Sequence, residues 1–158
     1  MKDAVTNIVI AGLGGQGVLK ASGIVADAAF RCGLDVKQSE LHGMSQRGGS
    51  VSSDVRFGRE VFSPMVTAGE ADFLVVVASD QVDVNRHQLR SGGVLIALDA
   101  VDATKLTNKR SFNVALLGAL SRHLDFAETV WLDAIRAAFA EKLHAANLQA
   151  FAQGRKGV

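Results

Sequence analysis

The polar segment Ser39–Gly49 gathers more side chains able to do chemistry than any other stretch of this sequence. Its donors and acceptors are, in order, Ser39, Glu40, His42, Ser45, Gln46 and Arg47. Arg47 stands beside Gly48 and Gly49, so its guanidinium can hold a phosphate or carboxylate through paired hydrogen bonds. Because loops on a rigid scaffold commonly carry binding sites, this segment is predicted to face a ligand.

Two other kinds of chemistry fit this segment poorly. His42, taken alone, is better explained as a hydrogen-bonded structural histidine than as a catalytic group. No second His or Cys lies at ligand spacing, so no metal site is expected. Ser45 lacks the sharp turn motif and the base that a nucleophilic serine needs.

A second motif precedes it, the glycine run Gly12-Leu13-Gly14-Gly15-Gln16-Gly17, which fits G-x-G-x-x-G between an expected strand and an expected helix. Such a turn lets the backbone approach a phosphate at a helix N-terminus. Glu40 occupies the place of the acidic residue that binds ribose in dinucleotide-binding folds, but the polar loop that follows argues against NAD. We therefore expect anion or phosphate binding here. The alternative is a tight turn whose small residues serve packing alone.

Composition excludes several classes of function. The 158 residues favour one domain, and a formal net charge of +1 gives no electrostatic case for nucleic acid or membrane partners. The single cysteine, Cys32, cannot form a disulfide framework or ligate an iron–sulfur cluster within the chain. No apolar run reaches membrane-spanning length and no secretory signal is recognisable, so a cytoplasmic protein is expected.

The elements expected around these motifs alternate between strands and helices. Buried strands are predicted at Asn7–Ala11, Asp35–Ser39, Phe73–Ala78 and Val94–Leu98, and helices at Val18–Cys32, Asp80–Leu89, Asn113–His123 and Val130–Ala146. Ser50–Phe57 alternates and is followed by a turn signal at Gly58-Arg59, which predicts a β-hairpin with Glu60–Phe62.

These elements predict an α/β fold. It should be a three-layer α/β/α domain with a mostly parallel, Rossmann-like sheet and the β-hairpin inserted in it. Ligands should bind at the carboxyl ends of the strands, where the glycine run and the 39–50 loop converge. Residues 1–152 are expected to form the domain, and residues 153–158 a flexible basic tail.

Three stretches together resemble the gamma domain of the pyruvate and 2-oxoacid:ferredoxin oxidoreductases, most closely the beta subunit of indolepyruvate ferredoxin oxidoreductase. They are the glycine run 12–17, the run Ser-Glu-Leu-His-Gly-Met-Ser-Gln-Arg-Gly-Gly-Ser-Val at 39–51, and Val-Arg-Phe-Gly at 55–58 with Ser63-Pro64. The C-terminal half is also similar, with Asn113–Leu120 followed by Phe139, Lys142, Asn147, Ala150-Phe151 and Gly154.

The resemblance implies an accessory subunit that is inactive alone. The complex would decarboxylate a 2-oxoacid oxidatively with coenzyme A and pass electrons to ferredoxin. Thiamine diphosphate and 4Fe-4S clusters would belong to a catalytic partner subunit. No cofactor is assigned to this chain alone, and no residue is assigned as a catalyst. The residues that would face coenzyme A are Gly12, Gly14, Gly15, Gln16, Gly17, His42, Ser45, Gln46, Arg47, Gly48 and Gly49.

One departure from the family bears on the substrate. The segment Val101–Phe112 is short and polar where the family often has a longer stretch.

Two alternatives stay open from the residues, namely a stand-alone Rossmann-type NAD(P)-binding oxidoreductase and a purely structural interaction domain.

Overall fold

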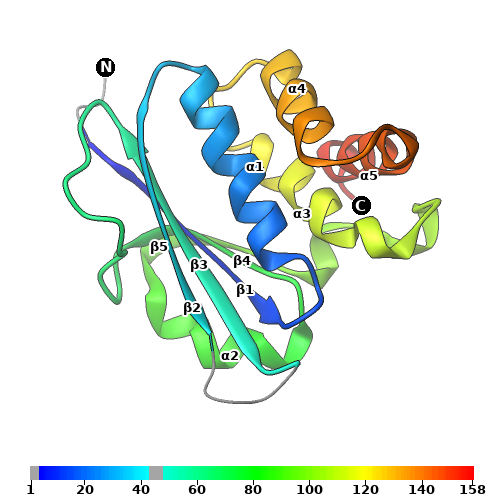
Figure 1. Ribbon diagram of the computed structural model, residues 1–158. Coiled ribbons are helices and arrows are strands. Elements are labelled where there is room, and N and C mark those ends of the chain that lie inside the picture. Colours follow the sequence, from blue (N-terminus) through cyan, green and yellow to red (C-terminus); the bar gives the residue numbers. More distant parts are fainter. Residues whose placement is uncertain (1–3, 43–47) are drawn as a thin grey trace.

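The computed structural model describes residues 4–42 and 48–158 of the chain (Figure 1). The strands are β1 (Thr6–Leu13), β2 (Asp35–His42), β3 (Ser50–Gly58), β4 (Ala71–Val76) and β5 (Leu89–Ile96). The helices are α1 (Val18–Arg31), α2 (Val82–Asn85), α3 (Phe112–Ser121), α4 (Glu128–Ala138) and α5 (His144–Lys156). Short 3₁₀ turns precede α2, α3 and α5.

The strands form one mixed sheet in the order β2-β3-β1-β4-β5. β1 pairs in parallel with β4, and β4 with β5, whereas β3 runs antiparallel to both β1 and β2. The α/β class is therefore confirmed, but a mostly parallel sheet holds only for the half that contains β4 and β5. The physical reason is that β3 inserts between β1 and β2, so both of its edges form antiparallel ladders.

The predicted hairpin between Ser50–Phe57 and Glu60–Phe62 is wrong. β3 uses one edge for β1 over eight residue pairs and the other edge for β2 over eight more. No edge of β3 is left for Glu60–Phe62, which forms no strand. β2 takes the place of the expected partner and continues three residues beyond Ser39, to His42.

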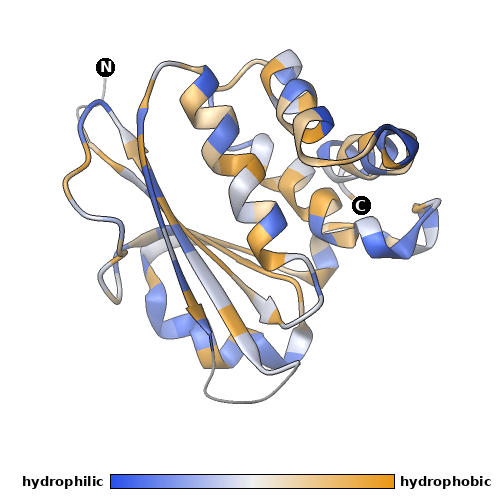
Figure 2. Ribbon diagram, in the orientation of Figure 1, coloured by the Kyte–Doolittle hydropathy of each residue, from blue (hydrophilic) through white to orange (hydrophobic). Residues whose placement is uncertain are grey.

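The larger core lies on the face of the sheet that carries α1, α3, α4 and α5 (Figures 1 and 2). Alternate residues of β1, such as Ile8 and Ile10, point into it, as do Val55 and Phe57 of β3. α3 is buried along nearly its whole length. Because every second side chain of a strand faces one side, this alternation fixes which strand residues pack under the helices.

The opposite face has a thinner cover. Its smaller apolar cluster comprises Val9, Val66, Ala71, Leu74 and Val76. The helix predicted at Asp80–Leu89 is only the four-residue α2 between 3₁₀ turns. The third layer of the expected α/β/α arrangement is therefore reduced to α2 and the segment after β3.

The C-terminal region differs from the prediction of one helix at Val130–Ala146. α4 ends at Ala138, and Phe139 takes an extended conformation before α5 begins at His144. The His144 Nε2 atom lies 2.9 Å from the Arg136 carbonyl oxygen and 2.8 Å from that of Phe139. A ring N–H there satisfies carbonyls that the end of α4 leaves unpaired, which stabilises the break.

α5 continues past the predicted domain boundary at residue 152. The helix runs to Lys156, and Gly154 is buried against α3. Residues 153–156, which the sequence places in a basic tail, thus belong to the last helix of the domain. The two helices α3 and α5 pack so closely because each presents a glycine, Gly118 or Gly154, to the backbone of the other.

Candidate functional site

The glycine run forms a closed loop between the carboxyl end of β1 and the start of α1. Gly15 and Gly17 have φ angles of 88° and 76°, which L side chains rarely adopt. The Leu13 N–H donates to the Gln16 Oε1 atom at 2.7 Å, and the Gln16 N–H donates back to the Leu13 carbonyl at 3.2 Å. The Gln16 oxygen, expected to face a ligand, therefore holds the loop in shape.

The glycine loop and the second predicted loop meet, as expected. The Gly14 N–H donates to the Gly49 carbonyl oxygen at 2.9 Å. A Cβ atom on Gly14 would lie 3.1 Å from the Gly48 backbone nitrogen, so only glycine permits this approach without a shift. Ser45, Gln46 and Arg47 lie outside the described residues, and the anion-binding role of Arg47 stays a prediction.

Glu40 and His42 lie at the end of β2 on the side of the sheet that faces α1. The His42 Nε2 atom is 3.4 Å from a Glu40 carboxylate oxygen, and both side chains are largely exposed. His42 also lines a small hollow beside the glycine loop, with Gly14 and Leu19. β3 separates β2 from β1, so Glu40 does not occupy the neighbouring-strand position from which an acidic residue reaches a ribose. This placement disfavours the dinucleotide-binding alternative.

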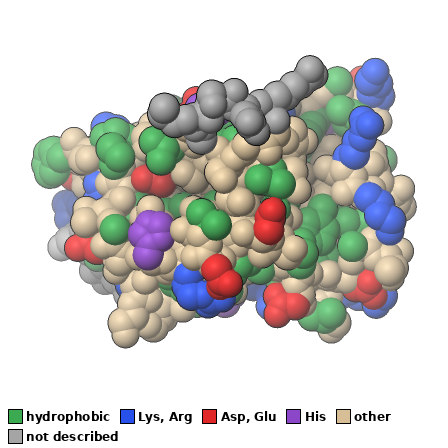
Figure 3. All heavy atoms as spheres, turned by 90° about the horizontal axis from the view of Figure 1, so that it is seen from below, with side chains coloured by type: hydrophobic (Ala, Val, Ile, Leu, Met, Phe, Trp, Pro, Cys, Tyr) green, Lys and Arg blue, Asp and Glu red, His purple; other side chains and the backbone are tan. Residues whose placement is uncertain are grey.

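A larger hollow of about 580 Å³ opens on the other side of the glycine loop. Its lining includes Lys20 from the first turn of α1, and Lys109 and Arg110 from the 3₁₀ turn before α3. Figure 3 shows Lys and Arg side chains along the right-hand edge of the molecule, where the segment before α3 lies. Three cations thus converge on backbone that approaches a helix N-terminus, a combination that suits an anionic ligand.

Apart from a smaller attraction between Lys109 and Asp102, the charges of the three cations are not compensated within the described part of the chain. The Lys20 ammonium donates to the Ala138 carbonyl at 2.9 Å, and Lys109 donates to the Ala103 carbonyl at 3.1 Å. Both acceptors are uncharged, and no carboxylate of the described residues forms an ion pair with Lys20, Lys109 or Arg110. The nearby Asp102 has a lowered pKa, chiefly because Thr104 donates hydrogen bonds to it.

Asn113, at the start of α3, lines this hollow and connects α3 to the glycine loop. Its side chain is 5% exposed, and its Nδ2 donates to the Gly17 carbonyl oxygen at 3.1 Å. A Cβ atom on Gly17 would contact this amide directly. Sequence reasoning missed Lys20, Lys109, Arg110 and Asn113 as site residues. The signal available was the basic pair before the Asn113–Leu120 stretch that already resembled the family.

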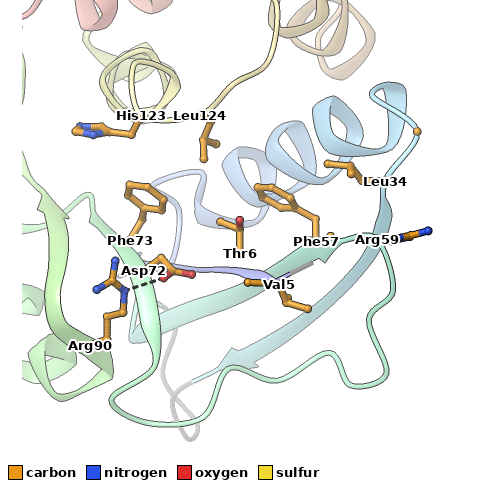
Figure 4. Close-up of a pocket in the computed structure, with 13 residues that line it drawn as sticks. Val5, Thr6, Leu34, Phe57, Arg59, Asp72, Phe73, Arg90, His123 and Leu124 are labelled. Atoms are coloured by element: carbon orange, nitrogen blue, oxygen red, sulfur yellow. Dashed lines mark hydrogen bonds and ion pairs between the residues drawn. The ribbon is translucent and has the colours of Figure 1, made fainter. Parts of the chain in front are cut away.

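A third hollow, of about 620 Å³, lies at the end of the sheet opposite the glycine loop (Figure 4). It opens beside Thr6 and Asp72, which stand at the starts of β1 and β4. The Arg90 Nε atom is 2.8 Å from an Asp72 oxygen, so these charges are already paired. Ligands of open α/β sheets bind at the carboxyl ends of the strands, which favours the glycine-loop end as the candidate site.

The described residues offer no cluster of metal ligands, and the sequence has too few cysteines for an iron–sulfur cluster. Among residues 4–42 and 48–158, no three His, Cys, Asp or Glu side chains come together as metal ligands. Cys32 is the only thiol in the sequence, and burial raises its pKa. A cysteine-ligated cluster needs several thiolates, so this chain cannot build one. No helix within the described part of the chain is both long and apolar enough to cross a bilayer.

Comparison of the sequence with known proteins gives matches that extend along nearly the whole chain. The model of the pyruvate ferredoxin/flavodoxin oxidoreductase family matches residues 7–157. Indolepyruvate oxidoreductase subunit IorB of Thermococcus kodakarensis is 35% identical over 192 aligned positions, which cover 95% of this chain and 94% of that protein.

Solved structures share the fold. The gamma subunit of a keto/oxoacid ferredoxin oxidoreductase from Geobacter sulfurreducens superposes with a TM-score of 0.80 at 24% identity, covering 97% of this chain and 95% of that one. The 2-oxoglutarate:ferredoxin oxidoreductase of Magnetococcus marinus, with 2-oxoglutarate, coenzyme A and succinyl-CoA bound, superposes with a TM-score of 0.79 at 22% identity. The match covers 98% of this chain and 31% of the Magnetococcus chain.

Proposed function

This chain belongs to the pyruvate ferredoxin/flavodoxin oxidoreductase family, and we propose that it is the gamma-type accessory subunit of an indolepyruvate-like 2-oxoacid:ferredoxin oxidoreductase. The family resemblance carried by residues 12–17 and 39–51 is confirmed. Relatives are small subunits of oxidoreductases of this class, which confirms the accessory-subunit role at that level. The aryl 2-oxoacid as substrate is supported by the name of the Thermococcus relative.

The chain's own contribution, in this proposal, is to bind coenzyme A at the glycine loop. The observation that carries it is the convergence of Lys20, Lys109 and Arg110 on the hollow beside Gly15 and Gly17. Coenzyme A bears a diphosphate and a further phosphate, which suit exposed cations and free backbone N–H groups. The Magnetococcus neighbour, with coenzyme A bound, supports the same ligand class.

The remaining chemistry falls to a catalytic partner subunit. There the bond between the oxoacid's carbonyl and carboxyl carbons breaks, carbon dioxide leaves, and the acyl carbon forms a thioester with coenzyme A. Iron–sulfur clusters on that partner would carry the two released electrons to ferredoxin, and thiamine diphosphate there would supply the carbanion chemistry. The single cysteine here supports the placement of the clusters on the partner. The proposed complex acts in the cytoplasm.

The test is the double substitution Lys109→Ala/Arg110→Ala in the reconstituted complex. Two exposed phosphate contacts are lost, so the apparent KM for coenzyme A should rise about tenfold, with a smaller change in kcat. A higher salt concentration should reduce the difference in KM between the variant and the native complex, because exposed charge pairs are screened. Arg86→Ala/Lys156→Ala removes the same charge at exposed positions outside the hollow and should leave the KM unchanged. An unaltered KM in the first variant would overturn the binding role.

Measurements on the isolated chain and on the reconstituted complex separate the two alternatives. A stand-alone NAD(P)-binding enzyme predicts that the isolated chain binds NAD(H), and that Gly14→Val abolishes this binding. A purely structural domain predicts that Lys109→Ala/Arg110→Ala leaves the coenzyme A dependence intact and that His42 substitutions matter only through assembly.

A further inference from the structure

Three large apolar side chains lie exposed along one margin of the sheet. Leu41 is 66% exposed, Phe62 86% and Met65 60%. We call these three residues the β2-edge strip. Figure 3 shows hydrophobic side chains at the left of the face, the side on which the segment after β3 lies in Figure 1. A cluster of large exposed apolar side chains, unlike a single one, marks an interaction surface.

Phe62 and Met65 belong to the segment 59–66, which runs beside β2 in the same direction. The Val61 N–H donates to an Asp35 carboxylate oxygen at 2.8 Å, near the start of β2. The Ser39 hydroxyl donates to the Pro64 carbonyl at 3.3 Å, farther along the strand. Phe62 therefore lies between these two attachments.

At one end of the strip, two of its side chains line the same small hollow. Leu41 and Met65 line it together, with Val66 and Gln88. The Val66 N–H donates to an Asp54 oxygen at 2.9 Å, which anchors the segment on β3. Phe62 and Met65 are thus presented by a segment that is attached at both ends, and Leu41 is presented by β2 itself.

β2 itself offers a second feature for docking. It is the outermost strand, and within the described residues no other strand pairs with its outer edge. Natural proteins shorten, twist or cover such edges, because unpaired N–H and C=O groups invite another chain. Here the edge is eight residues long and ends beside exposed Leu41.

We propose that the β2-edge strip and the adjoining edge of β2 bind the catalytic subunit of the same complex, an inference that rests on the proposed function. In the Magnetococcus oxidoreductase the matching fold is about a third of a longer chain, so it has a permanent protein neighbour there. Permanent interfaces are more apolar than transient ones, which suits three large side chains without charges. β2 also ends at His42, so a partner on the strip lies next to the glycine-loop site.

The test measures binding of this chain to the purified thiamine-diphosphate- and iron–sulfur-containing catalytic subunit. Phe62→Ser/Met65→Ser should raise the Kd about a hundredfold, since buried interface anchors each contribute about tenfold or more. Both side chains are exposed in the isolated chain, so its folding by circular dichroism should not change. Phe30→Ser is the matched control, because Phe30 is 71% exposed at the end of α1 and should leave the Kd unchanged.

The outcomes separate this inference from the proposed function. If the native chain does not bind the catalytic subunit, the accessory-subunit proposal fails and this surface fails with it. If the native chain binds and Phe62→Ser/Met65→Ser binds equally well, only the surface is overturned. If that variant merely converts a homodimer of this chain to monomers, the occupant is a second copy and the inference is again overturned.

Discussion

Replacing Gly154 by alanine should destabilise the domain, although alanine is the better helix former. A Cβ atom at this position would press on the Ala115 carbonyl oxygen and lie 2.9 Å from the Ala119 nitrogen. Ordinary contacts between heavy atoms need about 3.5–4.0 Å, so α5 must move away from α3 by more than about 1 Å. The helix gains about 1 kcal/mol in propensity, whereas overpacking costs up to about 3 kcal/mol or more where backbone must yield. We expect a net loss of about 2 kcal/mol.

The assay is urea unfolding of the isolated chain, followed by circular dichroism, with Gly23→Ala as the matched control. Gly23 lies inside α1, and a Cβ atom there meets nothing within 4 Å. This control should gain about 0.5–1 kcal/mol, so the two glycine-to-alanine changes should move in opposite directions. A Gly154→Ala protein as stable as the native one would refute close backbone packing of α3 on α5. Because α3 also carries Asn113, the destabilised variant should hold the glycine loop less firmly.

Three further substitutions test the loop and the thinner face of the sheet. Gly15→Ala should cost about 1–2 kcal/mol of unfolding free energy from its left-handed backbone alone. Gly17→Ala should cost more, because its Cβ atom also strikes Asn113. Equal losses of unfolding free energy, measured by urea unfolding, would contradict the contact with Asn113. Burial raises the pKa of the Asp54 carboxyl. The protonated carboxyl is therefore favoured in the folded state, and the stability that it contributes is lost as the pH rises from the ordinary carboxyl pKa through the raised one. Asp54→Asn, which keeps an acceptor for Val66, should therefore raise stability at neutral pH and lose that advantage below the ordinary carboxyl pKa, and a difference independent of pH would contradict this.

The candidate site was predictable in part, because the glycine loop that forms its backbone part follows from a short stretch of sequence. Glycines at 12–17 bounded by an apolar run and an amphipathic helix leave few conformations other than a strand-to-helix turn. The position of Lys109 and Arg110 beside the glycine loop was not predictable, since they stand more than ninety residues from Gly15. Only the packing of α3 beneath the sheet's carboxyl end brings them together.

Gln16 shows the limit of reading a motif residue by residue. The family resemblance implied a ligand contact for this residue, yet its oxygen accepts the Leu13 N–H. A polar side chain in a tight turn can satisfy either the ligand or the turn's own backbone, and spacing alone does not choose between them.

The sequence by itself determined the α/β class, the two loops that meet at the end of β1, and the family. Each of these depends on local periodicity or on short motifs, which the chain carries wherever it folds. Only the tertiary structure decided that β3 lies between β1 and β2, that α4 breaks before α5, and that Lys20, Lys109 and Arg110 share one hollow. Strand order and helix packing depend on which distant surfaces bury each other most completely, and no local pattern encodes that choice.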